Sequence, residues 1–281
     1  MDYIEIEAKC REEFRDILIA ELSELEYEAF METGDGFIGY IPENGFDPKQ
    51  LEALFAKYNE LAPIAYESRN VKEKNWNEEW EKNYDPVIVD DRCLIRASFH
   101  KPARSYPYEI VINPRMSFGT GHHETTWLMA QSLLDIDLHE KNALDIGCGT
   151  GILAILASKK GAKWVVAIDN NEWAYHNAVD NAILNGADNI EFKLGTIYET
   201  DVASKFDVIL ANINRNVLLD EMAEYVKYLL PGGSILISGF YVEDEKDMID
   251  LLEPLGFDLQ FKKNKNRWSV MCFLKRTGAL E

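Results

Sequence analysis

Three alternating glycines behind a short apolar run are the feature that most constrains the fold of this chain. Residues 141–169 are K-N-A-L-D-I-G-C-G-T-G-I-L-A-I-L-A-S-K-K-G-A-K-W-V-V-A-I-D, which predicts a buried strand, a glycine turn, a helix and a second strand ending on an acid. Gly147, Gly149 and Gly151 let the backbone turn sharply and approach a ligand, at which the following helix directs free N–H groups. Asp169 follows Gly147 by 22 residues, close to the spacing of about 20 that brings a carboxylate to ribose hydroxyls. The pattern predicts a nucleotide-cofactor site; the alternative is an ordinary strand-to-helix turn with incidental glycines.

The positions of these glycines also favour one cofactor over others. A dinucleotide site of the G-x-G-x-x-G type would have glycine at position 152, where this chain has Ile152, so NAD and FAD are less favoured. S-adenosylmethionine carries a nucleoside but no pyrophosphate, and it therefore needs no pyrophosphate contact at that helix. The sequence D-x-G-x-G-x-G resembles the first motif of Rossmann-like methyltransferases that use this cofactor.

Length and composition set the broad class of protein. A chain of 281 residues with 47% hydrophobic residues favours two folded domains. It begins M-D-Y-I-E-I-E-A-K-C and has no apolar run near 18 residues, which predicts neither export nor a membrane span and makes the cytoplasm the expected location. The cysteines form no C-x-x-C pair, so we expect reduced thiols and no zinc site. For Cys148, in the glycine loop, we expect a packing role rather than a nucleophilic one.

The net charge of −20 argues against tight, nonspecific binding of nucleic acid, because phosphate backbones are held by Lys and Arg. Residues 1–60 contain 16 Asp and Glu against 5 Lys and Arg, which gives −11 and favours a basic partner. Simple solubility is the alternative explanation.

This acidic part has the pattern of a small separate domain. Apolar spacing and turn residues predict the order strand, helix, strand, strand, helix, strand over residues 3–8, 12–25, 27–32, 37–41, 48–58 and 62–69. That order is the ferredoxin-like split unit, with two helices on one face of a small sheet. We expect residues 1–70 to form a docking domain, because they show no catalytic constellation.

A charged linker and a larger domain follow. In the linker, residues 71–86, Trp76 and Trp80 stand four apart, which predicts helical packing onto a neighbouring domain. The catalytic domain, residues 87–281, begins with strands over 87–99 and 108–114. The polar loop 116–126, M-S-F-G-T-G-H-H-E-T-T, precedes a helix expected over 127–134 and is well placed to close over a ligand. Its adjacent histidines lack metal-ligand spacing, so we expect no metal.

Further apolar runs complete a buried, mostly parallel sheet of seven strands. They lie at 163–168, 190–194, 206–211 and 234–238, with residues 231–233 expected as the turn before the last of them. Residues 257–261 and 268–274 flank a basic turn and predict the antiparallel edge hairpin that distinguishes methyltransferase sheets from dehydrogenase sheets. The fold class is therefore α/β, with a Rossmann-like methyltransferase domain behind a ferredoxin-like α+β domain.

Asn212 is the candidate catalytic residue. It directly follows the predicted strand F-D-V-I-L-A, at the sheet edge where ligands of such folds bind. Its amide carbonyl can accept N–H bonds from an amine nucleophile and fix the direction of the lone pair. The alternative is that Asn212 only caps a helix expected over 216–229.

Several segments together resemble the ribosomal protein L11 methyltransferase (PrmA) family. They are F-G-T-G-H-H-E-T-T, L-D-I-G-C-G-T-G-I-L-A-I, A-I-D-N-N, N-A-I-L-N-G, V-I-L-A-N-I and R-W-S-V-M. The resemblance covers nearly the whole chain. It implies methylation of lysine ε-amines and the N-terminal α-amine of ribosomal protein L11 with S-adenosyl-L-methionine, on the free protein or before full ribosome assembly, with substrate recognition by the small domain. It also disfavours DNA amines and release-factor glutamine as substrates.

Carried over residue by residue, the resemblance places cofactor contacts at Thr126, Gly147, Asp169 and Asn212, with Gly149 added from the general glycine loop. Phe118–Gly121 would lie over the methyl group. The family loop commonly has T-H-P-T-T where this chain has H-H-E-T-T, so proline is replaced by Glu124. Another basic protein or small amine as acceptor, and a noncatalytic ribosome-associated adaptor, stay open as alternatives. We expect a monomer without membrane contact.

Overall fold

The computed structural model describes residues 3–59, 63–71, 85–102, 104–113, 121–202 and 204–278. Compactness divides the chain into an N-terminal unit, residues 1–83, and a C-terminal unit, residues 84–281. Each unit is described by itself. The linker tryptophans Trp76 and Trp80 lie outside the described residues.

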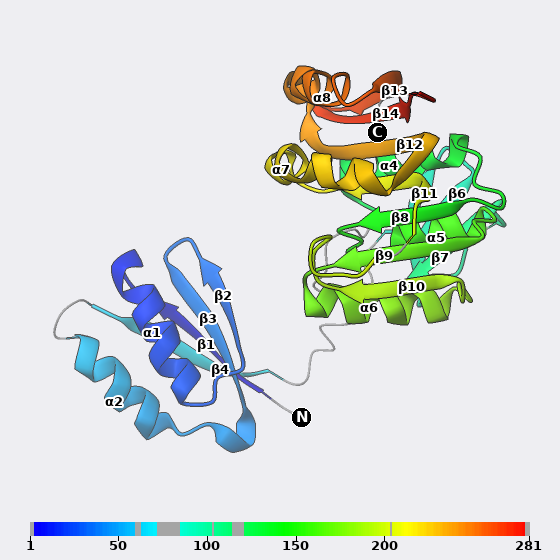
Figure 1. Cartoon of the computed structure of the whole chain (residues 1–281). Helices are drawn as coiled ribbons and strands as arrows, with labels where there is room; N and C mark the ends of the chain where they lie inside the picture. Colours follow the sequence, from blue (N-terminus) through cyan, green and yellow to red (C-terminus); the bar gives the residue numbers. More distant parts are fainter. Residues whose placement is uncertain are drawn as a thin grey trace. The chain divides into compact units, whose positions relative to one another are not determined.

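The N-terminal unit has the predicted order of elements (Figure 1). In chain order these are β1 (Tyr3–Lys9), α1 (Glu12–Glu24), β2 (Ala29–Thr33), β3 (Gly36–Pro42), the short 3-10 helix η1 (Glu43–Gly45), α2 (Pro48–Asn59) and β4 (Ala65–Val71). The strands form one antiparallel sheet in the order β2-β3-β1-β4, which confirms the ferredoxin-like prediction.

Alternation along β1 explains how the helices cover this sheet. Ile4, Ile6 and Ala8 are buried, and they share a core with Leu18 and Leu22 of α1 and with residues of α2. Since alternate strand residues point to opposite faces, both helices pack on the face of these apolar residues (Figure 1). The other face carries no helix from the residues of this unit that the structure describes.

The C-terminal unit is built on a seven-stranded sheet (Figure 1). Its strands are β8 (Asn142–Ile146), β9 (Trp164–Asp169), β10 (Ile190–Leu194), β11 (Phe206–Asn212), β12 (Leu229–Tyr241), β13 (Phe257–Lys265) and β14 (Trp268–Lys275). The order is β10-β9-β8-β11-β12-β14-β13, with β14 antiparallel to both of its neighbours and the other pairs parallel. The predicted antiparallel edge hairpin is thereby confirmed.

Helices cover both faces of this sheet (Figure 1). One face packs against α4 (Glu124–Asp135), α5 (Ile152–Lys159) and α6 (Glu172–Leu184). The other packs against α7 (Arg215–Tyr225) and α8 (Glu245–Leu252). Two buried apolar clusters therefore hold the sheet rigid, as expected for parallel strands with near-continuous apolar runs. No helix of the described residues is long and apolar enough to cross a membrane.

The expected strands at the start of this unit form a separate small sheet. Its strands are β5 (Val87–Val89), β6 (Cys93–Ala97) and β7 (Tyr108–Ile112), in the order β5-β6-β7. Buried residues of this sheet belong to the same cluster as α4 and α5. The small sheet thus covers those helices from outside.

Several predicted boundaries were wrong, among them three in the C-terminal unit. Helix α4 begins at Glu124 rather than at residue 127, because His123 caps it. Helix α7 ends at Tyr225 and continues only as the 3-10 helix η2 (Val226–Tyr228). Strand β12 begins at Leu229, so the expected turn at residues 231–233 lies within the strand bounds, beside a register shift against β11.

Candidate active site

A cavity of about 490 Å³ lies where strands β8, β9 and β11 end. This volume is in the range of small-molecule sites, and the carboxyl edge of a doubly wound sheet is where ligands of such folds bind. The cavity is lined by His123, Thr125, Gly147, Gly149, Asp169, Asn170, Asn171, Ala174, Asn212, Ile213, Asn214, Gly239 and Trp268. Four of the five residues predicted as site residues are in this set. The fifth, Thr126, lines a small adjoining recess together with Gly147, Gly149 and Asn212.

The glycine loop has the conformation that its sequence requires. Gly147, Gly149 and Gly151 have φ of 68°, 55° and 79°, in the left-handed region that residues with a Cβ adopt only with strain. The N–H groups of Gly147 and Cys148 donate to the carbonyl of Ile168 at 2.8 and 3.0 Å. These bonds tie the loop to the end of β9, beside the cavity.

The Asp169 carboxylate joins the two strand ends. Its Oδ2 accepts a hydrogen bond from Gly149 N at 2.8 Å, and its Oδ1 accepts one from Asn171 N at 2.9 Å. Each carboxylate oxygen can accept more than one hydrogen bond, so Asp169 can also accept from a ligand in the cavity that it lines. The side chain thus orders the glycine loop and offers acceptors to ligand hydroxyls.

Asn212 and Thr126 meet although 86 residues separate them in the chain. Asn212 Nδ2 donates to Thr126 Oγ1 at 3.3 Å, and Thr126 is almost fully buried in α4. Asn212 Oδ1 is also buried and accepts no hydrogen bond within the described part of the chain. A buried carbonyl oxygen without a donor is costly unless a ligand satisfies it.

The capping alternative for Asn212 is wrong. Helix α7 is capped by Asn214, whose Oδ1 accepts from Val217 N at 3.2 Å. Asn212 is the last residue of β11, two residues earlier. Its amide is therefore held by α4 rather than used to begin α7.

Gly147 and Gly239 both lie against Ile213, and neither position has room for a Cβ. A Cβ on Gly147 would come within 2.4 Å of Ile213 Cγ2, and a Cβ on Gly239 within 1.9 Å of the Ile213 carbonyl oxygen. Gly239, with φ of 101°, follows the stretch of β12 that pairs with β11. These close approaches fix the segment that carries Asn212.

An aromatic wall, formed by His123, Trp268 and Tyr241, was not predicted. The His123 and Trp268 rings meet edge to face with centroids 4.7 Å apart, and Tyr241 lies 4.2 Å from Trp268. His123 and Trp268 line the cavity. The sequence placed Trp268 only in an edge strand, and its register opposite Tyr241 on β12 brings it to the site.

Two buried groups in the β8 segment have shifted pKa values. Burial raises the pKa of Asp145 to about 7, although its Oδ2 accepts a hydrogen bond from Ala154 N at 3.1 Å. Burial also raises the pKa of the Cys148 thiol well above its usual value, so this thiol stays protonated at neutral pH. A protonated, buried thiol is a poor nucleophile, which agrees with the packing role expected for Cys148.

The start of α4 accommodates the Glu124 that replaces the family proline. Asn266 Nδ2, in the β13–β14 turn, donates to Glu124 Oε1 at 2.8 Å. The backbone N–H of Glu124 itself and this amide lower the pKa of the Glu124 carboxyl. Gly121 is described, whereas Phe118 to Thr120 of the predicted loop lie outside the described residues. Among the described residues, no three His, Cys, Asp or Glu side chains are grouped to hold a metal ion.

Comparison with known proteins identifies the family. A family model described as "Ribosomal protein L11 methyltransferase (PrmA)" matches residues 8–276. The chain belongs to this family. A PrmA-family protein named ribosomal protein L11 methyltransferase, from Phocaeicola vulgatus, is 41% identical over 98% of this chain and 100% of its own length. One of the same name from Porphyromonas gingivalis is 43% identical over 92% of this chain and 90% of its own length.

A solved structure agrees with this assignment. The crystal structure of a ribosomal protein L11 methylase from Lactobacillus delbrueckii subsp. bulgaricus has a TM-score of 0.64 and 28% identity, and covers 69% of this chain and 100% of its own. As a PrmA-family member, the chain is a class I methyltransferase that uses S-adenosyl-L-methionine.

The observed residues fit that cofactor. The cavity has room for a ligand of this size class, Asp169 can accept from hydroxyls, and the carbonyl oxygen of Asn212 lacks a donor among the described residues.

Proposed function

We propose that this enzyme transfers methyl groups from S-adenosyl-L-methionine to lysine ε-amines and the N-terminal α-amine of ribosomal protein L11. Membership of the PrmA family supports the substrate, since the relatives are named for it. An amine as the methyl acceptor is supported by the buried Oδ1 of Asn212, which has no donor among the described residues. An amine N–H is a donor that this oxygen can accept.

When bound, S-adenosylmethionine supplies a sulfonium methyl as the electrophile. We assign its contacts to Thr126, Gly147, Gly149, Asp169 and Asn212. Asp169 would accept from the ribose hydroxyls, and the glycine loop would lie against the nucleoside side of the ligand. Thr126 would act by holding the Asn212 amide through the 3.3 Å hydrogen bond.

The methyl acceptor must be a neutral amine, because an ammonium has no lone pair and free lysine has a pKa of about 10.4. Asn212 Oδ1 would accept an N–H of that amine and so fix the direction of its lone pair. Trp268, His123 and Ile213 offer a largely apolar surface beside it. Removal of water by this surface would lower the pKa of the amine and favour its neutral form.

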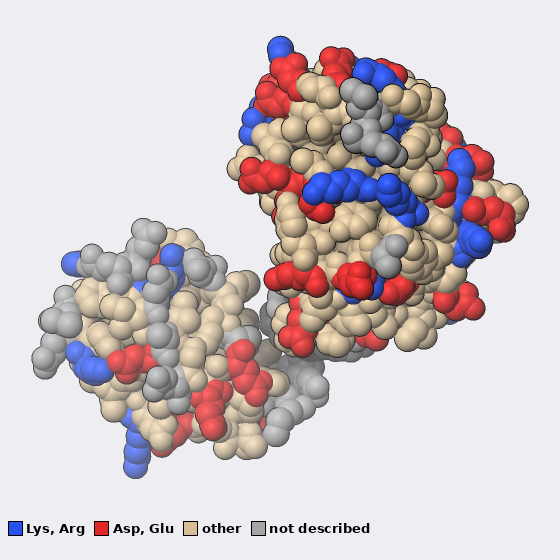
Figure 2. All heavy atoms as spheres, viewed as in Figure 1, with Lys and Arg blue, Asp and Glu red and all other residues tan. Residues whose placement is uncertain are grey.

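We assign residues 1–70 to substrate recognition, residues 71–86 to the linker and residues 87–281 to catalysis. The strongly acidic composition of residues 1–60 supports recognition of a basic protein, and acidic side chains lie on the visible face of both units (Figure 2). We propose that the enzyme acts as a monomer in the cytoplasm, on L11 that is free or not yet fully assembled into a ribosome, without tight binding of nucleic acid.

Transfer of label from methyl-labelled S-adenosylmethionine tests this function. We expect label in purified L11 and little label in other basic proteins or in free lysine. Label in the alternative acceptors but not in L11 would keep the methyltransferase and refute the substrate.

A further inference from the structure

One face of the sheet in the N-terminal unit carries no helix among the described residues. The side chains on this face are apolar at one side of the sheet and acidic at the other. Register places Met31 opposite Ile38, Ile38 opposite Glu7, and Glu7 opposite Glu67. These four residues form a row across all four strands, which we call the open-face row. Met31 is 50% exposed and Glu67 is exposed. One half of the row is therefore apolar and the other half acidic.

Glu7 and Glu67 make an unfavourable pair. Directly opposite residues on antiparallel strands lie close together, so like charges there destabilise the sheet. Neither carboxylate has a hydrogen bond or an ion pair with any described side chain, whereas the adjacent Glu5 accepts from Tyr40 Oη at 3.0 Å and pairs with Arg69. The cation nearest in sequence, Lys9, pairs with Asp35 at 3.1 Å.

Two cations, Lys9 and Arg69, share the open face with this pair, but each is paired with another carboxylate, Asp35 and Glu5 respectively. Asp35 raises the pKa of Lys9, and Glu7 and Glu67 add smaller contributions, so Lys9 balances the pair only in part.

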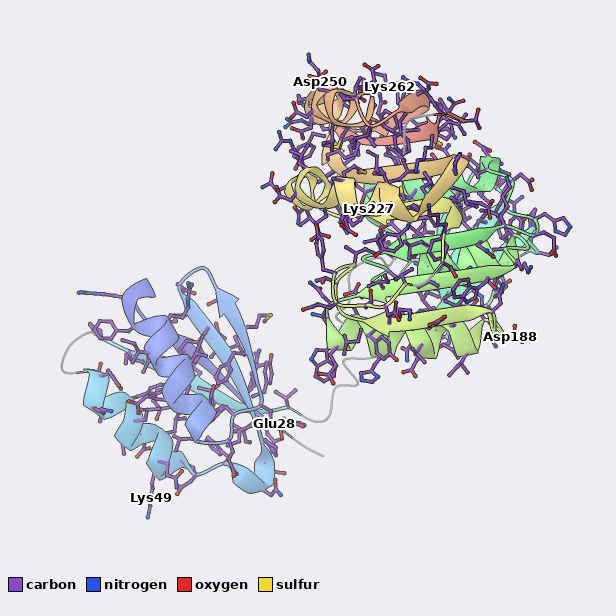
Figure 3. All side chains as sticks on the ribbon, in the orientation of Figure 1. Glu28, Lys49, Asp188, Lys227, Asp250 and Lys262 are labelled. Carbon is purple, nitrogen blue, oxygen red and sulfur yellow. The ribbon has the colours of Figure 1, made fainter. Side chains whose placement is uncertain are left out.

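The other described lysines of this unit lie elsewhere. Lys49 is at the start of α2 and projects away from the unit (Figure 3). Lys57, also on α2, pairs with Glu21 at 2.7 Å. Since α2 covers the opposite face of the sheet, neither lysine lies on the open-face row.

We propose that the open-face row is a docking surface for a lysine-bearing segment of the protein substrate. This inference rests on the proposed function. Long cationic side chains lay their apolar stems along apolar surface while the charged end meets a carboxylate. A lysine whose stem crosses Ile38 and whose ammonium lies between Glu7 and Glu67 satisfies both halves of the row. It also reduces the like-charge repulsion that Lys9 offsets only in part in the free protein.

Binding of L11 by full-length variants tests this surface. Calorimetry would compare the Kd of the unaltered protein with that of Glu7→Gln/Glu67→Gln and of Met31→Ser. We expect the double substitution to raise the Kd about tenfold at low salt, with a smaller effect at high salt because exposed charges are screened. Met31→Ser should raise the Kd to a lesser extent.

Two readouts separate docking from a structural role. Because the like-charge pair destabilises the sheet, the double variant should unfold at the same or a higher urea concentration while it binds L11 more weakly. Its kcat at saturating L11 and its affinity for S-adenosylhomocysteine should not change. Glu52→Gln, which removes an exposed carboxylate from α2, is the matched control and should leave the Kd unaltered.

The outcomes distinguish the two proposals. An unchanged Kd in the double variant, while the unaltered protein methylates L11, would refute the docking surface alone. An equal loss of affinity in Glu52→Gln would show a general effect of charge and would also refute it. Failure of the unaltered protein to methylate L11 would refute the proposed function itself.

Discussion

Asn212 Nδ2 donates to Thr126 Oγ1 across the junction of β11 and α4, and this leaves Asn212 Oδ1 buried without a partner among the described residues. A primary amide can rotate to exchange its oxygen and nitrogen. In the observed orientation the threonine oxygen accepts from the amide nitrogen, and the amide oxygen is left for another donor. In our proposal this bond orients the acceptor that holds the substrate amine.

Asn212→Ala should lower kcat on the order of 10- to 100-fold, because it removes an oriented hydrogen-bond acceptor from the reacting amine. The thermal midpoint should change little, because loss of the hydrogen bond to Thr126 is offset by removal of a buried oxygen that has no donor among the described residues. Steady-state kinetics with L11 provide the measurement. A near-normal kcat would remove Asn212 from the chemistry.

Thr126→Val should lower kcat by a smaller factor, because it frees the Asn212 amide while it keeps the side-chain shape. A double-mutant cycle with Asn212→Ala tests this coupling. The two effects should be strongly non-additive. Additive losses would show that the two residues act independently.

Asp169→Ala should weaken binding of S-adenosylhomocysteine by roughly 1–3 kcal/mol, through the loss of hydrogen bonds to a charged group. Calorimetric titration measures this change. Asp169→Asn keeps one oxygen for the N–H of Gly149 or Asn171 and is the milder variant. If both variants bind like the unaltered protein, the assignment of the ribose partner is wrong.

Gly147→Ala should weaken cofactor binding, because a Cβ at φ of 68° would lie 2.4 Å from Ile213 Cγ2 and would displace the segment next to Asn212. Gly232→Ala is the matched control. It has a similar φ of 78°, and its Cβ would approach only to 3.4 Å of Thr277 Cγ2. Both variants should lose stability, on the order of 1–3 kcal/mol, and only Gly147→Ala should lose affinity. Equal affinities in the two would contradict this view of the glycine loop.

Asp145 should make stability depend on pH. Its pKa is raised to about 7 in the folded protein, against about 3.9 in an unfolded chain. Between these values the folded protein keeps a proton that the unfolded chain has released, so stability falls as the pH rises through this window and is constant above it.

Asp145→Asn removes this titration. The variant should therefore gain thermal stability relative to the unaltered protein as the pH is raised from 5 to 8, and thermal unfolding at several pH values measures the difference. A stability difference that does not vary with pH would show that Asp145 is ionised throughout.

The sequence alone predicts those parts of the site whose residues lie close together along the chain. Gly147, Gly149 and Asp169 belong to one strand-turn-helix-strand segment, and the apolar runs of a buried parallel sheet are easy to recognise. The ends of β8 and β9 therefore follow from residue spacing. Asn212 was also recognisable at the end of a strand, although the sequence left open whether it only caps the following helix.

The aromatic wall could not be predicted because it depends on strand register. Trp268 reaches the cavity only because β14 inserts between β12 and β13 and places it opposite Tyr241. Similarly, the close approach of Gly239 to Ile213 joins a residue of β12 to the residue that follows β11. No spacing along the chain encodes either contact.

Intact-mass spectrometry of purified ribosomal protein L11, after incubation with this enzyme and S-adenosylmethionine, tests the central claim most directly. The account predicts mass gains in steps of one methylene unit, strongly reduced with Asn212→Ala and with Asp169→Ala. An unchanged mass of L11, while calorimetry shows that the unaltered enzyme binds S-adenosylhomocysteine, would contradict it.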